Sequence, residues 1–296
     1  MTIRLESNCL QIESAVRDVP AACAAFEEIL GAGPIEQELV RRISGVVLDI
    51  DHRGCGDAMF QFCSPLVDTI FTAEELRRVG PSVTNLTFFV ADAAGTRDLL
   101  AAEGAATRMA WQTMPGSWQQ LLGPGNAKPD EDLAPGFFMG TRHLFGFDFE
   151  FSEAPWYDVA AQSYMHPAFT YPRPAIADKV RRLERLRVLV DDIGHYTGNL
   201  LRLVDAGDRT GVYAHREDEA VRSARIALRG LELEYVQPLA AGPLRDRLAE
   251  RGPAVTTAVF SADPAAGLPP AAFATTGILG FDIEVEHEPA VTHPGE

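Results

Sequence analysis

The hexapeptide GFDFEF at residues 146–151 returns, altered, as GFDIEV at residues 280–285. Each copy alternates an acidic residue with an apolar one, which is typical of a half-buried β-strand. One face of such a strand carries the two carboxylates, and the other face packs into a core. A strand of this kind that occurs twice indicates a duplicated fold. It also raises the question of whether its carboxylates hold a metal ion, transfer protons or form ion pairs.

The chain before this hexapeptide predicts one unit of strand, helix and three strands, followed by a second unit. In the first unit, residues from Leu10 onward alternate as in a half-buried strand, Pro20 fits the first turn of a helix, and Gly31 fits its end. The second unit restarts at Ser82 and closes with the hexapeptide itself. The remaining predicted elements are strands at residues 35–40, 45–51 and 58–63 and helices at residues 73–79 and 96–103.

A long stretch of irregular sequence, residues 106–142, separates the helix and the last strand of the second unit. It contains Trp111 and Trp118 among several Gly and Pro residues. Long loops in compact domains are often lids or walls of binding sites, so we predict that these tryptophans contact a substrate. A surface excursion with a small core of its own is the alternative.

The pattern returns in the second half of the chain at a nearly constant offset. A third strand phrase starts near Arg185, and the joint LRRVGPSVT at residues 76–84 has a counterpart in LAERGPAVT at residues 248–256. Similarity at a constant offset is hard to obtain by chance, so it indicates four modules in two pairs. The fourth module is too short for a helix and two further strands before its GFDIEV phrase.

These repeats predict an α+β protein built from four βαβββ-type modules, the fourth of which is shortened. We expect a paired-module domain with the working pocket at residues 1–153 and a second, degenerate paired-module domain at residues 181–296. An aromatic and proline-rich linker at residues 154–180 joins them. The second domain lacks the length to close a full pocket.

The composition argues against several classes of partner. With 296 residues and a net charge of -16 the chain is acidic, whereas binding to nucleic acid or to an anionic membrane needs clustered Lys and Arg. No apolar run is long enough to span a membrane and the N-terminus lacks the core of a signal peptide, so we expect a cytoplasmic protein. The four cysteines lack CxxC spacing and are expected to be buried thiols. The oligomeric state is left open, a homodimer included.

The chain resembles the vicinal oxygen chelate superfamily, which includes glyoxalase I, extradiol dioxygenases, methylmalonyl-CoA epimerase and bleomycin-resistance proteins. The resemblance covers nearly the whole chain and rests on VRDV at residues 16–19, ILG at residues 29–31 and the GFDFEF hexapeptide. It implies that two modules pair into a cupped sheet. It also implies that metal ligands come from the first and last strands of each module.

Carried over to this chain, the superfamily's ligand positions fall on Gln11, Gln61, Asn85 and Glu150. Only Glu150 is a common ligand type, and the histidine usual at the first-strand positions is missing. Three neutral amides and one carboxylate suit a first-row transition metal poorly. We therefore expect no metal or other cofactor. If a divalent metal binds at these four residues, a hard ion fits their oxygen atoms best.

The same positions in the second half hold Arg185, Glu234, Thr257 and Glu284. An arginine does not bind a cation, so we expect the arginines and glutamates of this concavity to pair with one another as a structural plug. An anion-binding function for these arginines is the alternative.

The concave face of the first half is expected to carry six polar side chains with few cationic partners. Carboxylates crowded in a partly dry cup repel one another, so one of them can stay protonated near neutral pH and act as a general acid or base. We expect Glu150 or Glu13 to transfer protons, while the other groups bind and orient the substrate. The six side chains are those of Gln11, Glu13, Gln61, Asn85, Asp148 and Glu150.

We therefore predict a small-molecule isomerase or lyase that acts on an oxygenated, carbonyl-containing substrate without a metal. His143 is a candidate proton shuttle at the pocket rim, with an exposed turn histidine as the alternative. A non-catalytic small-molecule-binding protein of the resistance type and a metal-dependent glyoxalase or dioxygenase are the alternative functions. The sequence contains no GxSxG, P-loop, GxGxxG or HExxH motif, so hydrolase, kinase and nicotinamide-dehydrogenase functions have no support.

Overall fold

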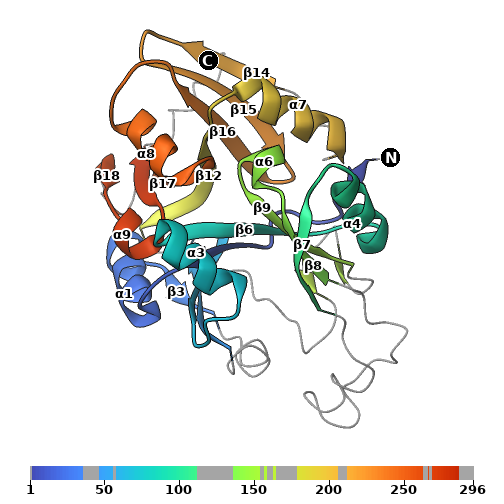
Figure 1. The fold of residues 1–296 in the computed structure, drawn as a ribbon. Helices are drawn as coiled ribbons and strands as arrows, with labels where there is room; N and C mark the ends of the chain where they lie inside the picture. Colours follow the sequence, from blue (N-terminus) through green and yellow to red (C-terminus); the bar gives the residue numbers. More distant parts are fainter. Residues whose placement is uncertain are drawn as a thin grey trace, which may run out of the picture.

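The computed structural model has two large β-sheets with helices packed around them (Figure 1). It describes residues 2–35, 47–55, 58–111, 136–153, 157–158, 163–164, 179–205, 212–262, 266 and 269–286. Residues 111, 157–158, 163–164 and 212–215 are described for their backbone alone. The α+β class predicted from the repeats is confirmed.

The first sheet joins the first two modules through their first and last strands. β2 (Gln11–Ala15) lies parallel to β5 (Ala58–Pro65). β6 (Ser82–Phe89) lies antiparallel to β2 and parallel to β9 (Asp148–Ser152). The other elements of this half are α1 (Val19–Leu30), β3 (Gly33–Pro34), β4 (Leu48–Cys55), α3 (Phe71–Val79), α4 (Ala93–Ala102), β7 (Ala106–Trp111), β8 (Gly136–Gly140) and α6 (Arg142–Phe145). The strand order is β3-β4-β5-β2-β6-β9-β8-β7.

The second sheet repeats this arrangement with a shortened last module. β12 (Val180–Leu189) lies parallel to β16 (Leu231–Pro238) and antiparallel to β17 (Ala254–Ala262), which is parallel to β19 (Asp282–Glu286). The other elements are α7 (Ile193–Leu203), β13 (Val204–Asp205), β14 (Val212–Glu217), β15 (Val221–Leu228), α8 (Pro243–Arg251), β18 (Ala271–Phe273) and α9 (Thr276–Leu279). The strand order is β14-β15-β16-β12-β17-β19-β18. Of the residues described between β17 and β19, only β18 and the single turn of α9 form elements. This agrees with the prediction that the fourth module is too short for a full helix and two further strands.

An aspartate begins the long helix of each complete module. The side chains of Asp18, Asp92 and Asp192 accept hydrogen bonds from backbone N–H groups in the first turns of α1, α4 and α7. Such caps satisfy donors that have no partner within the helix. The helix predicted at residues 96–103 therefore begins earlier, directly after Asp92.

The glycine that opens each GFD phrase allows the two halves to approach closely. Gly146 and Gly280 end α6 and α9 with φ angles of 79° and 89°. A Cβ atom at Gly146 would lie 2.5 Å from Val188 Cγ1, and one at Gly280 would lie 2.5 Å from the backbone nitrogen of Ser82. Each contact crosses from one half of the molecule to the other, so both positions require glycine for space as well as for conformation.

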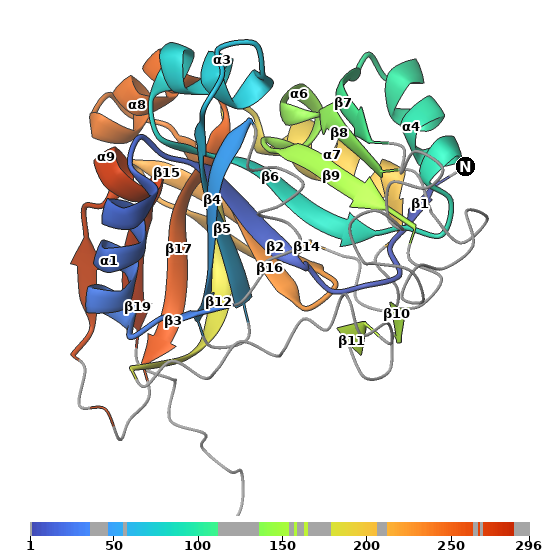
Figure 2. The same cartoon turned by 90° about the horizontal axis from the view of Figure 1, so that it is seen from below.

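The apolar faces of the two sheets share one core. Phe60 on β5 stacks on Phe281 with ring centroids 5.5 Å apart, and Phe26 of α1 meets Phe260 of β17 at 6.3 Å. Helices from the two halves also lie side by side, α1 against α9 and α6 against α7 (Figure 2). In addition, β1 (Ile3–Arg4) pairs in parallel with β13 of the second half. The division into two domains around residues 154–180 stays a prediction.

Several predicted boundaries differ in the structure. β4 runs on to Cys55, beyond the predicted strand at residues 45–51, and the strand expected at residues 35–40 lies almost wholly outside the described residues. The long stretch at residues 106–142 begins and ends with strands β7 and β8, and its centre is outside the described residues. Most of the predicted linker is also outside them, apart from β10 (Tyr157–Asp158), β11 (Ser163–Tyr164) and its last two residues. No helix among the described residues is long and apolar enough to cross a membrane.

Candidate functional site

Polar side chains from five neighbouring strands line up in two rows across the first sheet. The row between them holds Ile12, Phe60, Leu86 and Phe149, which turn to the opposite face and are buried in the core. This alternation follows from the two-residue period of a β-strand. The longer polar row contains His52, Gln61, Glu13, Asn85 and Asp148, on β4, β5, β2, β6 and β9. The shorter row contains Gln11, Thr87 and Glu150, on β2, β6 and β9.

Glu13 is the more deeply buried of the two glutamates that were predicted to transfer protons. Its side chain is held at both carboxyl oxygens. Thr84 Oγ1 donates to Oε1 at 2.7 Å, and Gln61 Nε2 donates to Oε2 at 2.5 Å. Burial raises the pKa of Glu13 above its ordinary value, and the Thr84 hydrogen bond opposes that rise.

Glu150 has a similar environment one row away. Thr87 Oγ1 donates to Glu150 Oε2 at 2.6 Å, and Gln11 Nε2 donates to the same oxygen at 3.4 Å. Burial, followed by the negative charge of Glu13, raises the pKa of Glu150 to about 8. At neutral pH this carboxyl group is therefore mainly protonated and can donate a proton.

Two threonines of β6 belong to the cluster and were not predicted. β6 has an extra residue at Thr84, because Glu13 pairs with Asn85 whereas the next residue of β2 pairs with Val83. A bulge of this kind breaks the simple alternation of faces, so the Thr84 hydroxyl reaches Glu13 although Asn85 is on the same side. Regular alternation, which was the only signal in the sequence, therefore missed Thr84.

Asn85 connects the two threonines. Its Oδ1 accepts a hydrogen bond from Thr87 Oγ1 at 3.3 Å, and its Nδ2 donates to Thr84 Oγ1 at 3.5 Å. Hydrogen bonds thus run from the carboxyl group of Glu13 to that of Glu150 through Thr84, Asn85 and Thr87. Such a path couples the protonation state of one carboxyl group to the other.

His52 extends the cluster to β4. Its side chain is fully buried, and its Nε2 lies 2.9 Å from Oε1 of Gln61, whose Nε2 donates to Glu13. No functional role was predicted for His52, which directly follows the strand predicted at residues 45–51. The longer β4 places this histidine within the sheet, where it fixes the orientation of the Gln61 amide.

Asp148 contacts arginine residues rather than the two glutamates, and its predicted contact with a substrate stays a prediction. Its Oδ1 accepts the backbone N–H of Arg142 at 2.9 Å, and its Oδ2 lies 3.3 Å from Arg108 Nη1. Asp282 has the matching role in the fourth module, where it accepts the backbone N–H groups of Thr275 and Thr276. The aspartate of each GFD phrase therefore orders the helical turn before it.

The remaining predicted residues lie elsewhere or outside the described part of the chain. His143 is exposed on α6, with Nε2 3.3 Å from the backbone oxygen of Glu103, and contacts neither glutamate, so its predicted role as a proton shuttle has no geometric support. Trp111 ends β7, and its side chain is not described. Trp118 lies outside the described residues.

Comparison with known proteins bears on the fold. No protein-family model matches the sequence, and no curated protein sequence matches it. Among solved structures, a mutant of 4-hydroxymandelate synthase from Streptomyces coelicolor aligns with 88% of this chain and 73% of its own, at 14% identity and a TM-score of 0.57. A fusion of a xylose isomerase-like TIM barrel with 4-hydroxyphenylpyruvate dioxygenase aligns with 91% of this chain and 40% of its own, at 13% identity and a TM-score of 0.50.

This chain has the vicinal oxygen chelate fold. The paired modules and their central first and last strands are thereby confirmed as the architecture expected from the sequence. Methylmalonyl-CoA epimerase from Mycobacterium tuberculosis matches 50% of the chain and 87% of its own length, at 17% identity and a TM-score of 0.35. At 14% and 13% identity, the likeness to the first two structures concerns the fold and leaves the reaction to be argued from the site.

The four residues at the ligand positions implied by the resemblance form hydrogen bonds with one another and with their neighbours. Gln11 and Gln61 direct amide N–H groups at the carboxyl oxygens of Glu150 and Glu13, and these donors would oppose a cation. The described residues contain no group of three or more His, Cys, Asp and Glu side chains arranged to hold a metal ion. Three neutral amides and one carboxylate are a poor donor set for zinc or iron, and the absence of a metal stays a prediction.

The corresponding face of the second sheet is filled by ion pairs, as expected for a structural plug. Glu234 Oε2 lies 3.0 Å from Arg185 Nε and 2.7 Å from Arg187 Nε. Arg185 also contacts Glu286 at 2.6 Å, and Arg187 contacts Glu284. Mutual pairing leaves these arginines occupied with carboxylates of their own sheet.

Proposed function

We propose that this protein is a small-molecule isomerase or lyase that acts on an oxygenated, carbonyl-containing substrate, with Glu150 and Glu13 as the proton-transferring groups. One observation carries the proposal: two glutamates are buried close together, each held by its own threonine hydroxyl and glutamine amide. Among the described residues, no lysine or arginine forms an ion pair with either one. Buried carboxyl pairs of this kind are typical of acid/base catalysis.

The pair supplies one acid and one base at neutral pH. Two neighbouring carboxylates resist being ionised together, so the pair holds one proton. Glu150, with a pKa of about 8, carries that proton and donates it to the carbonyl oxygen of the substrate. Glu13 in its ionised form removes a proton from the carbon beside the carbonyl. The enediol formed from a hydroxycarbonyl substrate becomes an isomer when Glu13 returns its proton to the former carbonyl carbon and Glu150 takes up the proton of the neighbouring hydroxyl. In a lyase, the enol instead expels a leaving group from the next carbon while Glu150 takes back the enol proton.

The threonines and amides position the carboxyl groups during this exchange. When Glu150 is ionised, the Thr87 hydroxyl donates to it; when Glu150 is protonated, the same hydroxyl is free to donate to Asn85 Oδ1. Gln11 and Gln61 fix the carboxyl groups through their N–H donors, which refines the substrate-orienting role expected from the sequence. In this mechanism no metal stabilises the intermediate, and hydrogen bonds do so instead.

Hydrogen exchange with solvent tests the proposal across several classes of candidate substrate at once. The protein is incubated in deuterium oxide with a panel of small hydroxyketones, hydroxyaldehydes and 2-oxo acids, and proton NMR follows deuterium uptake at the carbon beside the carbonyl. We expect the wild type to catalyse uptake into at least one class and Glu150→Gln to lose that activity. Glu27→Gln, at an exposed position on α1, is the matched control and should keep it.

Binding measurements on the same variants separate an enzyme from a binding protein. If the wild type catalyses no exchange with any compound and Glu150→Gln still binds a ligand with unchanged affinity, the non-catalytic alternative is favoured. Loss of exchange with retained affinity is the outcome that the proton-transfer proposal requires.

A further inference from the structure

A buried histidine lies at the end of the hydrogen-bonded side chains that lead away from Glu13. His52 on β4 is directly opposite Gln61 on β5, and Gln61 is directly opposite Glu13 on β2. The three strands run side by side in Figure 2. The imidazole Nε2 is 2.9 Å from Gln61 Oε1, and Gln61 Nε2 is 2.5 Å from Glu13 Oε2. A single amide group therefore joins the histidine to the carboxyl group.

The backbone of His52 is held in place by an ion pair. Asp51 Oδ1 accepts the backbone N–H of His52 at 2.8 Å and lies 3.1 Å from Arg53 Nη1. Arg53 Nη1 also donates to the backbone oxygen of His52 at 3.1 Å. The His52 side chain is fully buried, so close packing restricts the turning of its ring. The imidazole is thus a fixed neighbour for the Gln61 amide.

The Gln61 amide can bind its two neighbours in either of two orientations. A side-chain amide has donors on its nitrogen and an acceptor oxygen, so half a turn exchanges them. With its N–H toward Glu13, the amide stabilises the ionised carboxylate, which only accepts hydrogen bonds. With its oxygen toward Glu13, it needs a protonated carboxyl group as the donor. The orientation of this amide therefore favours one protonation state of Glu13 over the other.

A proton on His52 Nε2 favours the first of these orientations. A neutral imidazole has one N–H group, and at Nε2 this group needs the Gln61 oxygen as its acceptor. The amide N–H of Gln61 is then directed at Glu13, which is the arrangement in the structure. A proton at Nδ1 alone would make Nε2 an acceptor and would favour the opposite orientation.

The second glutamate has no matching anchor among the described residues. Gln11 Nε2 donates to Glu150 Oε2 at 3.4 Å, a longer contact than the one between Gln61 and Glu13. No donor within the described ranges holds the side-chain oxygen of Gln11. The Gln11 amide is therefore free to turn when Glu150 gains or loses a proton. The two glutamates have similar direct partners but differ in what holds their glutamines.

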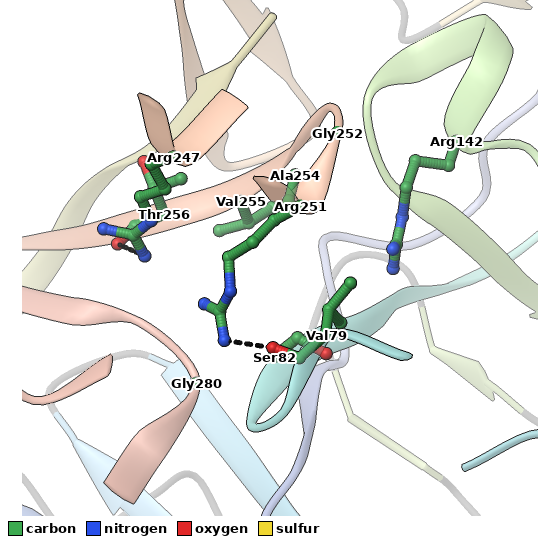
Figure 3. A pocket seen from close by; sticks show the side chains of 10 residues that line it. All are labelled: Val79, Ser82, Arg142, Arg247, Arg251, Gly252, Ala254, Val255, Thr256 and Gly280. Carbon is green, nitrogen blue, oxygen red and sulfur yellow. Dashed lines mark hydrogen bonds between the residues drawn. The ribbon is translucent and has the colours of Figure 1, made fainter. Parts of the chain in front are cut away.

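The crevice between the two halves is separate from this group of side chains. Figure 3 shows its lining, which includes Arg142 of α6 and Arg251 of α8 but none of His52, Gln61 and Glu13. The orientation of the Gln61 amide therefore depends on its neighbours within the first sheet.

With Glu13 as the base of the proposed function, on which this inference rests, we propose that His52 is a positioning residue for the reaction. By donating from Nε2 to Gln61, it keeps the amide N–H on Glu13 and favours the ionised form that removes a proton from the substrate. Once Glu13 has taken that proton, the same N–H favours its return. His52 thereby distinguishes the base from the acid in a pair whose direct hydrogen bonds are alike.

The position of the His52 ring proton tests this role without any substrate. Protein labelled with nitrogen-15 in its histidines is compared with His52→Gln, which identifies the His52 signals by their loss. Long-range proton–nitrogen correlation then shows which ring nitrogen carries hydrogen, and we expect a proton at Nε2. A neutral ring with its proton at Nδ1 alone would overturn the proposal, because Gln61 would then present its N–H to the histidine.

Turnover in the exchange assay tests the consequence for catalysis. His52→Phe keeps a ring of similar size without a donor, whereas His52→Gln can place an amide N–H where Nε2 was. We expect His52→Phe to lower kcat about tenfold, the effect of one hydrogen bond, with KM nearly unchanged. His52→Gln should regain most of this loss. His195→Phe, the same substitution at an exposed position on α7, is the control and should match the wild type.

The two measurements separate failure of this role from failure of the proposed function. A wild type that catalyses no exchange refutes the proposed reaction, whichever nitrogen of His52 carries the proton. An active wild type whose His52 has its proton at Nδ1 alone refutes the positioning role while the reaction stands. A folded His52→Phe with unchanged kcat does the same. If His52→Phe does not fold, the ring proton of the wild type decides.

Discussion

The hydroxyl oxygen of Thr87 lies 2.6 Å from Oε2 of Glu150 and donates a hydrogen bond to it when that carboxyl group is ionised. This contact opposes the effect of burial on the pKa of Glu150, because a hydrogen bond to the charged form favours that form. The reactivity of the glutamate therefore depends on a neighbour that the strand pattern alone does not single out.

Replacing Thr87 with valine should raise the pKa of Glu150 above its native value of about 8. Valine has nearly the same shape but cannot donate, so only the effect of the hydrogen bond is removed. Carbon-13 NMR titration of the labelled carboxyl groups measures the change. Thr84→Val provides the comparison, because the Thr84 hydroxyl that it removes donates to Glu13 and not to Glu150. An unchanged Glu150 titration in Thr87→Val would contradict the role given to this hydroxyl.

The pH dependence of solvent exchange should follow the protonation of Glu150. As the general acid it must carry its proton, so we expect the catalysed rate to fall as the pH rises through about 8. Rates of deuterium uptake, measured across this range with correction for the uncatalysed reaction, give the profile. A rate that keeps rising well above this value would assign the acid to another group.

The stability of the fold should also depend on Glu150. Its pKa is 4.5 in an ordinary environment and about 8 in the folded protein, so between these values the folded state holds a proton that the unfolded chain releases. The resulting stabilisation is fully present below 4.5 and is lost as the pH rises through about 8. Glu150→Gln is neutral throughout, so we expect it to be more stable than the wild type at about pH 9. Urea denaturation of both proteins, with Glu27→Gln as the control, measures the difference.

Glu234 should be essential to the stability of the second sheet. Its carboxylate contacts the buried Arg185 and the partly exposed Arg187 and Arg225, so Glu234→Ala leaves these cations without their shared partner. We expect a loss of about 3 kcal/mol in the free energy of unfolding. Glu217→Ala breaks an exposed pair with Arg222 and should cause no measurable change. Equal effects of the two variants would show that the network is not a structural unit.

Removal of metal ions should leave the exchange activity unchanged. The amide groups at three of the four ligand positions direct N–H donors or hydrogen-bonded oxygens at neighbouring residues. Elemental analysis of protein purified without added metal, together with activity before and after treatment with a chelator, checks this expectation. A stoichiometric ion whose removal abolishes exchange would restore the metal-dependent alternative.

The sequence predicted the architecture well, because alternation and repeats are local signals that survive in each copy. The faces of β9 follow directly from GFDFEF, and Glu13, Gln61 and Asn85 share a row because each lies on a first or last strand. Asp148 could not be distinguished from Glu150 in this way, since its partner Arg108 arrives from β7. Thr84 joins the cluster through a bulge in β6, and His52 joins it because β4 is longer than predicted. Neither feature leaves a signal in the composition or in the period of the sequence.

The stacking of Phe60 on Phe281 joins the aromatic cores of the two halves of the duplicated chain. A fragment cut at the linker would expose the aromatic face that its other half covers, and it would lose cooperativity as well as solubility. The second half, whose own polar face is filled by ion pairs, covers this aromatic face of the first half.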